Sequence, residues 1–155
     1  MQMQLKTIHK YIGQEPIITE WVLVDQMQTD IFGKITRWYT QGHNDPKWAM
    51  EFSPHGGTIL HGFFIISLVT HFLKIGGFYF SDGRNPLNYG IDKARMLRPV
   101  IIGDGVKLRD RISVIDVAQK DQGRRLVKTG HEIEADDGNE RPVAYIEYLN
   151  FWQPL

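Results

Sequence analysis

Six histidines are the main candidates for acid–base chemistry, because the chain has no cysteine and therefore no thiolate nucleophile, disulfide or cysteine-ligated metal. His43 stands out among them. It follows the polar residues TQG and comes just before Asp45-Pro46, a pair that predicts a helix with an N-cap aspartate and a proline in its first position. A histidine in such a polar loop is suited to general acid–base catalysis, because imidazole exchanges protons near neutral pH. A solvated surface histidine is the alternative interpretation.

The other histidines carry weaker signals. His61 and His71 fall within an apolar segment, where we expect hydrogen-bonded histidines of the core, and His55 lies in the turn SPHGG as a further candidate to face the site. No two histidines are four residues apart with a third ligand in a recognisable pattern. We therefore predict no metal site and no cofactor.

Helical signals surround His43 on both sides. The segment 25–38 carries apolar residues at helical spacing behind a capping box of Asp25 and Gln28, which indicates an amphipathic helix. A short helix is expected from Asp45 through Phe52. The run ILHGFFIISLVTHFLKIGG is apolar on nearly every face and ends in the helix-terminating pair Gly76-Gly77, so we predict a buried central helix.

Extended segments dominate the rest of the chain. Alternating and β-branched residues, separated by turn clusters such as KDQGR and DDGNERP, predict four strands at Leu97–Ile102, Val106–Ala118, Arg125–Ala135 and Val143–Trp152. Helices followed by antiparallel strands indicate an α+β fold, in which a sheet wraps around one long central helix. This is the outline of a hot-dog fold.

Length and charge limit the remaining possibilities. A chain of 155 residues with 42% hydrophobic residues suits one domain, 1–155. Lys+Arg and Asp+Glu balance at 18 each without a basic stripe, so we expect neither nucleic acid nor a membrane surface as a partner. The first residues lack the apolar core of a secretory signal, and the longest apolar run is too short to span a bilayer, which predicts a cytoplasmic protein.

Four stretches of the chain resemble the MaoC-like and nodulation-protein-N-like group of (R)-specific acyl-thioester hydratases. They follow one another along nearly the whole chain in the order and spacing of that family: GQEPIITEWVLVDQ, HNDPKWAMEFSPHGGTILHGFFIISL, NYGIDKARMLRPVIIGD and RPVAYIEYL. The resemblance implies a hot-dog dimer that adds water reversibly across the double bond of an enoyl thioester carried on coenzyme A or acyl carrier protein.

The resemblance also assigns a catalytic dyad, an aspartate and a histidine five residues apart. His43 takes the position of the histidine, but the position of the aspartate holds Trp38, and Arg37 replaces the usual glycine before it. An indole cannot accept a proton, and sequence alone brings none of Asp30, Asp45 or Glu51 to its place. Trp38 has two interpretations. Either the tryptophan merely fills space after the catalytic function was lost, or it forms a remodelled pocket wall for a bulky substrate.

The reaction needs hydrogen-bond donors to the thioester oxygen as well as a proton carrier. The resemblance and the expected helix start make Gly62 the candidate, although helix packing explains a glycine there equally well. The full set of expected substrate-binding residues is Trp38, Gly57, His61, Gly62 and Ser67. An aromatic cluster is expected mainly in the core, with part of it lining an acyl tunnel: Phe63, Phe64, Phe72, Phe78, Tyr79 and Phe80.

Three functions fit this sequence. The first is a hydro-lyase acting on an acyl thioester as a homodimer, with His43 as the only base and acid or helped by a carboxylate that is not adjacent in sequence. The second is a repurposed biosynthetic dehydratase, isomerase or cyclase in which Trp38 shapes the pocket for a bulky substrate. The third is a non-catalytic partner subunit of a heteromeric hydratase. We predict the first.

Overall fold

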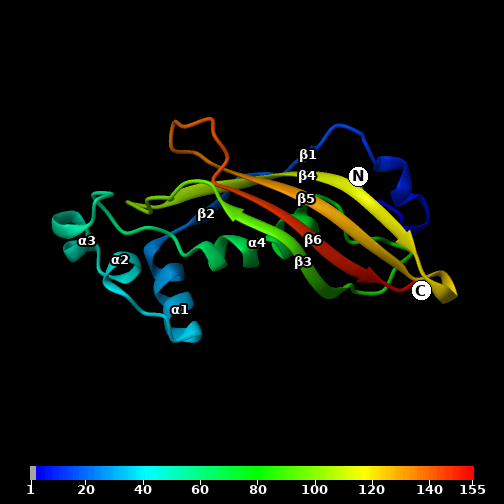
Figure 1. Ribbon diagram of the computed structural model, residues 1–155, viewed down its shortest axis with the longest axis horizontal. Helices are drawn as coiled ribbons and strands as arrows, with labels where there is room; N and C mark the ends of the chain where they lie inside the picture. The colour runs from blue at the N-terminus through cyan, green and yellow to red at the C-terminus, as the bar shows by residue number, and fades with distance from the viewer. Residues whose placement is uncertain (1–2) are drawn as a thin grey trace.

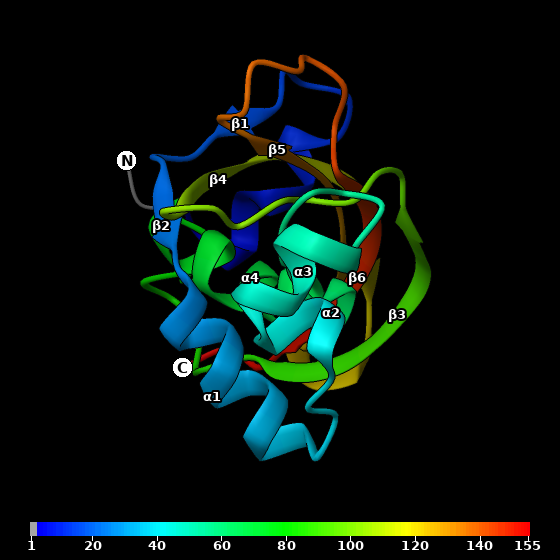
Figure 2. The same cartoon turned by 90° about the vertical axis from the view of Figure 1, so that its left-hand side faces the viewer.

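The computed structural model describes residues 3–155 as one antiparallel sheet curved around a long helix, α4 (Figures 1 and 2). The sheet has six strands in the order β1-β4-β5-β6-β3, and β2 also pairs with β4. The strands are β1 Ile17–Ile18, β2 Val22–Val24, β3 Leu87–Met96, β4 Val106–Gln119, β5 Arg125–Ala135 and β6 Ala144–Trp152. The predicted α+β hot-dog architecture is confirmed.

The helices other than α4 lie at the two ends of this assembly. In Figure 1, α1, α2 and α3 gather at one end, beyond the start of α4. The helices are η1 Leu5–Tyr11, α1 Gln26–Thr36, α2 Gln41–Asn44, α3 Pro46–Phe52, α4 Gly62–Ile75 and η2 Asp121–Gly123. Within residues 3–155, none of the helices is both long and apolar enough to cross a bilayer.

Helix α1 forms for the predicted reason, but it faces an unexpected way. The Asp25 side chain accepts from the Gln28 backbone, and the Gln28 side chain accepts in return from the Asp25 backbone, which completes the capping box. The apolar residues Met27, Ile31 and Ile35 are exposed, whereas the small Thr29 and Gly33 are buried. The apolar stripe of α1 is therefore uncovered in a single chain.

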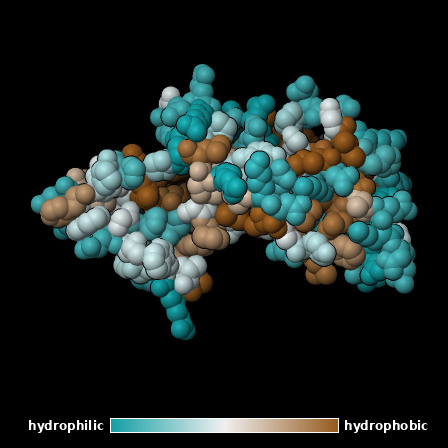
Figure 3. Space-filling model, in the orientation of Figure 1, coloured by the Kyte–Doolittle hydropathy of each residue, from teal (hydrophilic) through white to brown (hydrophobic). Residues whose placement is uncertain are grey.

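Helix α4 is the predicted central helix, but in the single chain it is buried on one face only. Its buried residues are Ile65, Val69, Phe72 and Leu73, which join the core beneath the sheet. Phe63, Ser67 and His71 are exposed on the opposite face, and His71 is thus not a core histidine. Figure 3 shows apolar surface, in brown, at several places along the long axis.

One predicted strand is wrong, and two short strands were missed. Residues 97–102 form no strand, because Pro99 has no N–H to donate and the segment makes only the isolated bridge between Ile101 and Ile59. The preceding segment, β3, pairs with β6 instead. The short strands β1 and β2 were not predicted, since they exist through their pairing with β4 and have little pattern of their own.

A buried polar chain crosses the core face of the sheet. His131 Nδ1 lies 2.6 Å from Asp110 Oδ2, and the Thr129 hydroxyl lies 2.7 Å from His131 Nε2. Both ionisable side chains are fully buried, and Asp110 Oδ1 has no hydrogen-bond partner. Burial raises the pKa of Asp110, and the neighbouring His131 acts in the opposite direction. The arrangement resembles a catalytic triad but has no access to a substrate, so it is structural.

Replacing His131 with leucine should destabilise the fold by about 3–5 kcal/mol, because it leaves the Asp110 carboxyl buried without a partner. The double variant Asp110→Val/His131→Leu removes both polar groups and should be more stable than His131→Leu alone. Urea unfolding of the wild type, both single variants and the double variant measures the coupling. Additive losses would show that the pair is not coupled.

Candidate active site

His43 lies in the one-turn helix α2 rather than in the predicted loop. Helix α2 packs so closely on α1 that a Cβ at Gly33 would lie only 3.0 Å from Asn44 Oδ1. The Asn44 side chain accepts from the Thr40 backbone and donates to the Thr29 carbonyl, which joins the two helices. A glycine in α1 therefore sets how near His43 comes to the body of the protein.

A hydrogen-bonded network holds the main chain around His43. Gln26 Nε2 donates to the His43 carbonyl and to Asp30 Oδ1, both at 2.8 Å. Asn44 Nδ2 donates to the same Asp30 oxygen at 2.9 Å, and the Thr58 hydroxyl donates to Gln26 Oε1 at 2.6 Å. The structure thus places Asp30 next to the histidine segment, held by two amides.

The His43 imidazole has a defined tautomer. Its Nδ1 lies 2.7 Å from the Ile59 carbonyl oxygen, which can only accept, so Nδ1 carries the proton. The other ring nitrogen, Nε2, is left with a lone pair. A half-buried imidazole oriented in this way is a ready proton acceptor.

His61 packs directly on His43. The two rings stack with centroids 3.9 Å apart, and Phe32 lies 5.3 Å from the His61 ring. His61 is the N-cap residue of α4 and is 4% exposed, and its Nε2 has no hydrogen-bond partner. Burial, reinforced by the His43 charge and opposed by Asp30, lowers the pKa of His61 to about 4. The expectation of a core histidine holds for its burial and fails for its hydrogen bonding.

Two cavities meet at His43 and Gly62, which line both of them. One, of about 200 Å³, is mainly aromatic and is lined by Phe32, Thr36, Trp38, His43, His61, Gly62 and Phe63. The other, of about 410 Å³, is mainly aliphatic and is lined by His43, Ile59, Leu60, Gly62, Ile65, Met96, Leu97, Arg98, Pro99 and Val100. The structure therefore brings His43, Trp38, His61 and Gly62 together around adjoining hollows.

Two positions that depart from the resemblance have definite geometry. Arg37 ends α1 with φ of 60°, the left-handed conformation that glycine adopts most easily, so the arginine is strained where a glycine would fit. Trp38 follows it with its side chain 64% exposed and on the wall of the aromatic cavity. The indole is thus not packed into the core.

The remaining predicted site residues lie apart from this group. Gly57 is buried, and a Cβ there would lie 3.0 Å from Ile101 Cγ2. Ser67 donates to the Phe64 carbonyl and lines a separate cavity beside β3, and His55 is exposed in its turn. Gly62 lines both cavities, but Met96 also packs against it, with Cγ 3.0 Å from the position of a Cβ. The substrate contacts of these residues stay predictions.

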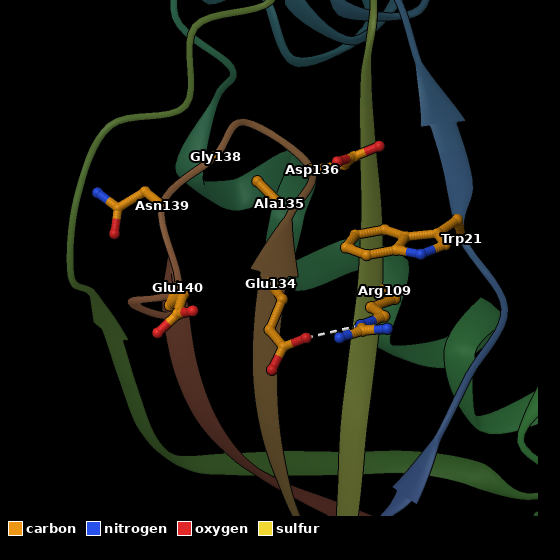
Figure 4. Close-up of a pocket in the computed structure, with 8 residues that line it drawn as sticks. All are labelled: Trp21, Arg109, Glu134, Ala135, Asp136, Gly138, Asn139 and Glu140. Atoms are coloured by element: carbon orange, nitrogen blue, oxygen red, sulfur yellow. Dashed lines mark hydrogen bonds and ion pairs between the residues drawn. The ribbon is translucent and has the colours of Figure 1, made fainter.

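Another hollow, of about 500 Å³, lies elsewhere, on Trp21 just before β2, on β4 and β5, and on the loop that follows β5 (Figure 4). Its cationic group is already paired: Arg109 Nε donates to Glu134 at 2.6 Å, and the guanidinium stacks 4.4 Å from the Trp21 ring. None of the predicted site residues lines this hollow.

Comparison with known proteins identifies relatives over nearly the whole chain. The family model described as "MaoC like domain" matches residues 7–135. Nodulation protein N of Rhizobium leguminosarum bv. viciae is 31% identical over 153 residues, which are 98% of this chain and 92% of that protein. 3-Hydroxyacyl-thioester dehydratase Z of Mycobacterium tuberculosis is 26% identical over 137 residues, 88% of this chain and 87% of that protein.

Solved structures share the fold at low sequence identity. A monoamine oxidase regulatory protein from Archaeoglobus superposes with a TM-score of 0.76 at 18% identity, covering 99% of this chain and 96% of that one. An R-hydratase of Pseudomonas aeruginosa gives a TM-score of 0.68 at 17% identity, covering 90% and 79%. These likenesses establish the architecture.

The stability of the protein should depend on His61 between pH 4 and 6.5. The unfolded chain binds a proton at this residue near pH 6.5, whereas the folded chain binds it only near pH 4, so acidification favours the unfolded state. The free energy of unfolding should fall across this range by up to roughly 3 kcal/mol more in the wild type than in His61→Phe. Urea unfolding at several pH values measures the difference. Ser67→Ala, on the exposed face of the same helix, should behave like the wild type, and equal slopes in wild type and His61→Phe would contradict the assignment.

Proposed function

The chain belongs to the MaoC-like family of hydratases and dehydratases, and on that basis we propose that it hydrates or dehydrates an acyl thioester, with His43 as the general base and acid. The observation that carries the proposal is the hydrogen bond from His43 Nδ1 to the Ile59 carbonyl. It leaves Nε2 as a proton acceptor on a residue that lines both cavities.

One imidazole is sufficient for the chemistry. In the dehydration direction, His43 Nε2 removes the proton from the α-carbon of a 3-hydroxyacyl thioester, and the electron pair moves to the thioester oxygen. When this enolate collapses to form the double bond, the β-hydroxyl leaves and takes the same proton from His43, so that water is released. Hydration follows these steps in reverse.

Asp30 supports His43 in this proposal without moving a proton. Its Oδ1 accepts from both Gln26 and Asn44, and Gln26 donates in turn to the His43 carbonyl. The carboxylate thus orders the main chain that carries the imidazole. The missing aspartate of the dyad is replaced by a positioning residue, while proton transfer is left to His43 alone.

The reacting end of the thioester would lie where the two cavities adjoin. The first N–H groups of α4 have no intrahelical partner and lie at the positive end of the helix dipole. The N–H of Gly62, the first residue of the helix, is therefore suited to bind an oxygen that gains negative charge. Trp38 and His61 form part of the wall of the aromatic cavity. A glycine at position 62 has two explanations, the close contact with Met96 and the approach of the thioester.

A homodimer and a cytoplasmic location are part of the proposal. Among residues 3–155, β3 pairs with β6 alone, so its other edge is free, and its Leu87, Tyr89 and Ile91 are exposed. A second copy that pairs along this edge would also cover the outer face of α4 and remove an exposed sheet edge.

A repurposed enzyme on the same scaffold is the second candidate, favoured by Trp38. An exposed indole on the wall of an aromatic cavity fits stacking on a bulky substrate better than packing after loss of function. Solved structures of the same fold include a 3R-hydroxyacyl-ACP dehydratase complex. A role as the partner subunit of such a complex is therefore the third candidate. A chain that is stable alone as a dimer and turns over substrate would eliminate that role.

Replacing His43 with alanine should abolish turnover of crotonyl-CoA and of 3-hydroxybutyryl-CoA, with a loss in kcat of at least roughly 10²-fold, because no other group takes the proton. Absorbance of the enoyl thioester follows the reaction in both directions. The exposed His9→Ala, on η1 and outside the candidate site, is the matched control and should retain wild-type rates. A wild-type protein that is inert toward a broad panel of CoA and acyl-carrier-protein thioesters would refute the proposal.

Trp38→Asp should increase hydration of crotonyl-CoA by roughly 10-fold or more, since it restores a second proton carrier and opens the aromatic cavity. Trp38→Asn opens the same space without an ionisable group and separates the two contributions. Equal gains in both variants assign the effect to space alone. No gain in either variant would show that the tryptophan does not block the usual reaction.

A further inference from the structure

Within residues 3–155, His61 is the one buried side chain on the walls of the two adjoining cavities that has a polar atom, Nε2, without a hydrogen-bond partner. Its ring is held between His43 and Phe32, so it cannot turn freely to find another partner. A buried donor or acceptor without a partner costs about 1–3 kcal/mol, and such groups are few in native proteins. The position of this atom, beside the proposed proton carrier, suggests that its partner is part of a substrate.

The charge state of His61 restricts what it can do there. With its pKa lowered to about 4, the imidazole is neutral wherever an ordinary histidine would begin to titrate. A neutral imidazole carries a single N–H and does not compete with His43 for the proton. It can therefore donate a hydrogen bond while remaining unchanged through the reaction.

The surroundings of His61 favour, as the acceptor of its hydrogen bond, an oxygen that gains negative charge. His61 is the N-cap residue of α4, a helix of 14 residues, so it directly precedes the first N–H groups of that helix, although its side chain does not cap them. The other walls of this cavity are largely aromatic, with Phe32, Trp38 and Phe63, and the last two are exposed in the single chain.

We infer that His61 donates a hydrogen bond from Nε2–H to the carbonyl oxygen of the bound thioester, together with the N–H groups at the start of α4. This rests on the proposed function and adds a second histidine to it. His43 transfers the proton, while His61 keeps its own proton and stabilises the enolate oxygen. The stacking of the two rings holds donor and base in one fixed arrangement.

Two substitutions separate donation from packing. His61→Phe keeps a planar ring for the stack and removes the nitrogen, whereas His61→Gln restores an N–H donor of similar reach. With crotonyl-CoA, His61→Phe should lower kcat by roughly 10²–10³-fold with little change in KM, and His61→Gln should recover at least roughly a tenth of the wild-type kcat. His71→Phe, exposed on the same helix, should leave both constants unchanged.

A spectroscopic measurement tests the donor independently of turnover. Isotope-edited infrared spectra of bound crotonyl-CoA, labelled with ¹³C at the thioester carbonyl, should show a lower stretching frequency in the wild type than in free solution. The shift should be smaller in His61→Phe and largely restored in His61→Gln. This pattern in a protein that binds but does not turn over the thioester would support the donor and refute the proposed catalysis.

Other outcomes would overturn the inference. A carbonyl shift that is equal in wild type and His61→Phe shows that His61 does not contact the oxygen, even if the enzyme is active. Equal losses of kcat in His61→Phe and His61→Gln, with equal carbonyl shifts, assign a packing role only. Failure to bind any thioester refutes the donor and the proposed function together.

Discussion

The hydrogen bond between the His43 imidazole and the Ile59 carbonyl links the two parts of the chain from which the site is built. It connects α2, at the helical end, with the segment that leads into α4, and in the neutral imidazole it makes Nε2 of His43 the accepting nitrogen. The approach of α2 depends in turn on Gly33, which lets Asn44 pack on α1 without a clash. The two adjoining cavities, the tautomer of His43 and the stacking of His61 on His43 all depend on this close approach, because each needs α2 close to the start of α4.

The two histidine pairings of the fold illustrate how hydrogen bonding separates a structural group from a functional one. His131, on β5, has partners at both ring nitrogens, Asp110 of β4 among them, and is fully buried. His61 is almost as buried, but its Nε2 is unpaired and its ring borders a cavity. In the first case polar contacts within the chain satisfy the imidazole. In the second case the chain leaves a buried imidazole nitrogen without a hydrogen-bond partner.

The departures from the family pattern have a common location, the turn between α1 and α2. Arg37 adopts the backbone conformation of a glycine, and Trp38 extends into the aromatic cavity with most of its side chain exposed. Neither change disturbs the hydrogen bonds around Asp30 and His43. The hydrogen-bonded network around His43 and the changed cavity wall at Trp38 are thus separate features of the candidate site.

Local patterns in the sequence determined the family, the capping of α1 and α3, the central helix, the long strands β4 to β6 and the position of His43, because capping and alternation depend on neighbouring residues. Only the tertiary structure decided the rest. The short strands β1 and β2, the stacking of His61 on His43, the placement of Asp30 and the buried Asp110–His131 pair all arise from contacts between distant segments. The outward face of α1 has the same origin, since close packing at Gly33 and Asn44 outweighed the burial of Met27, Ile31 and Ile35. Such contacts leave no periodic signal, so the sequence identifies His43 as the candidate histidine but does not reveal which residues surround it.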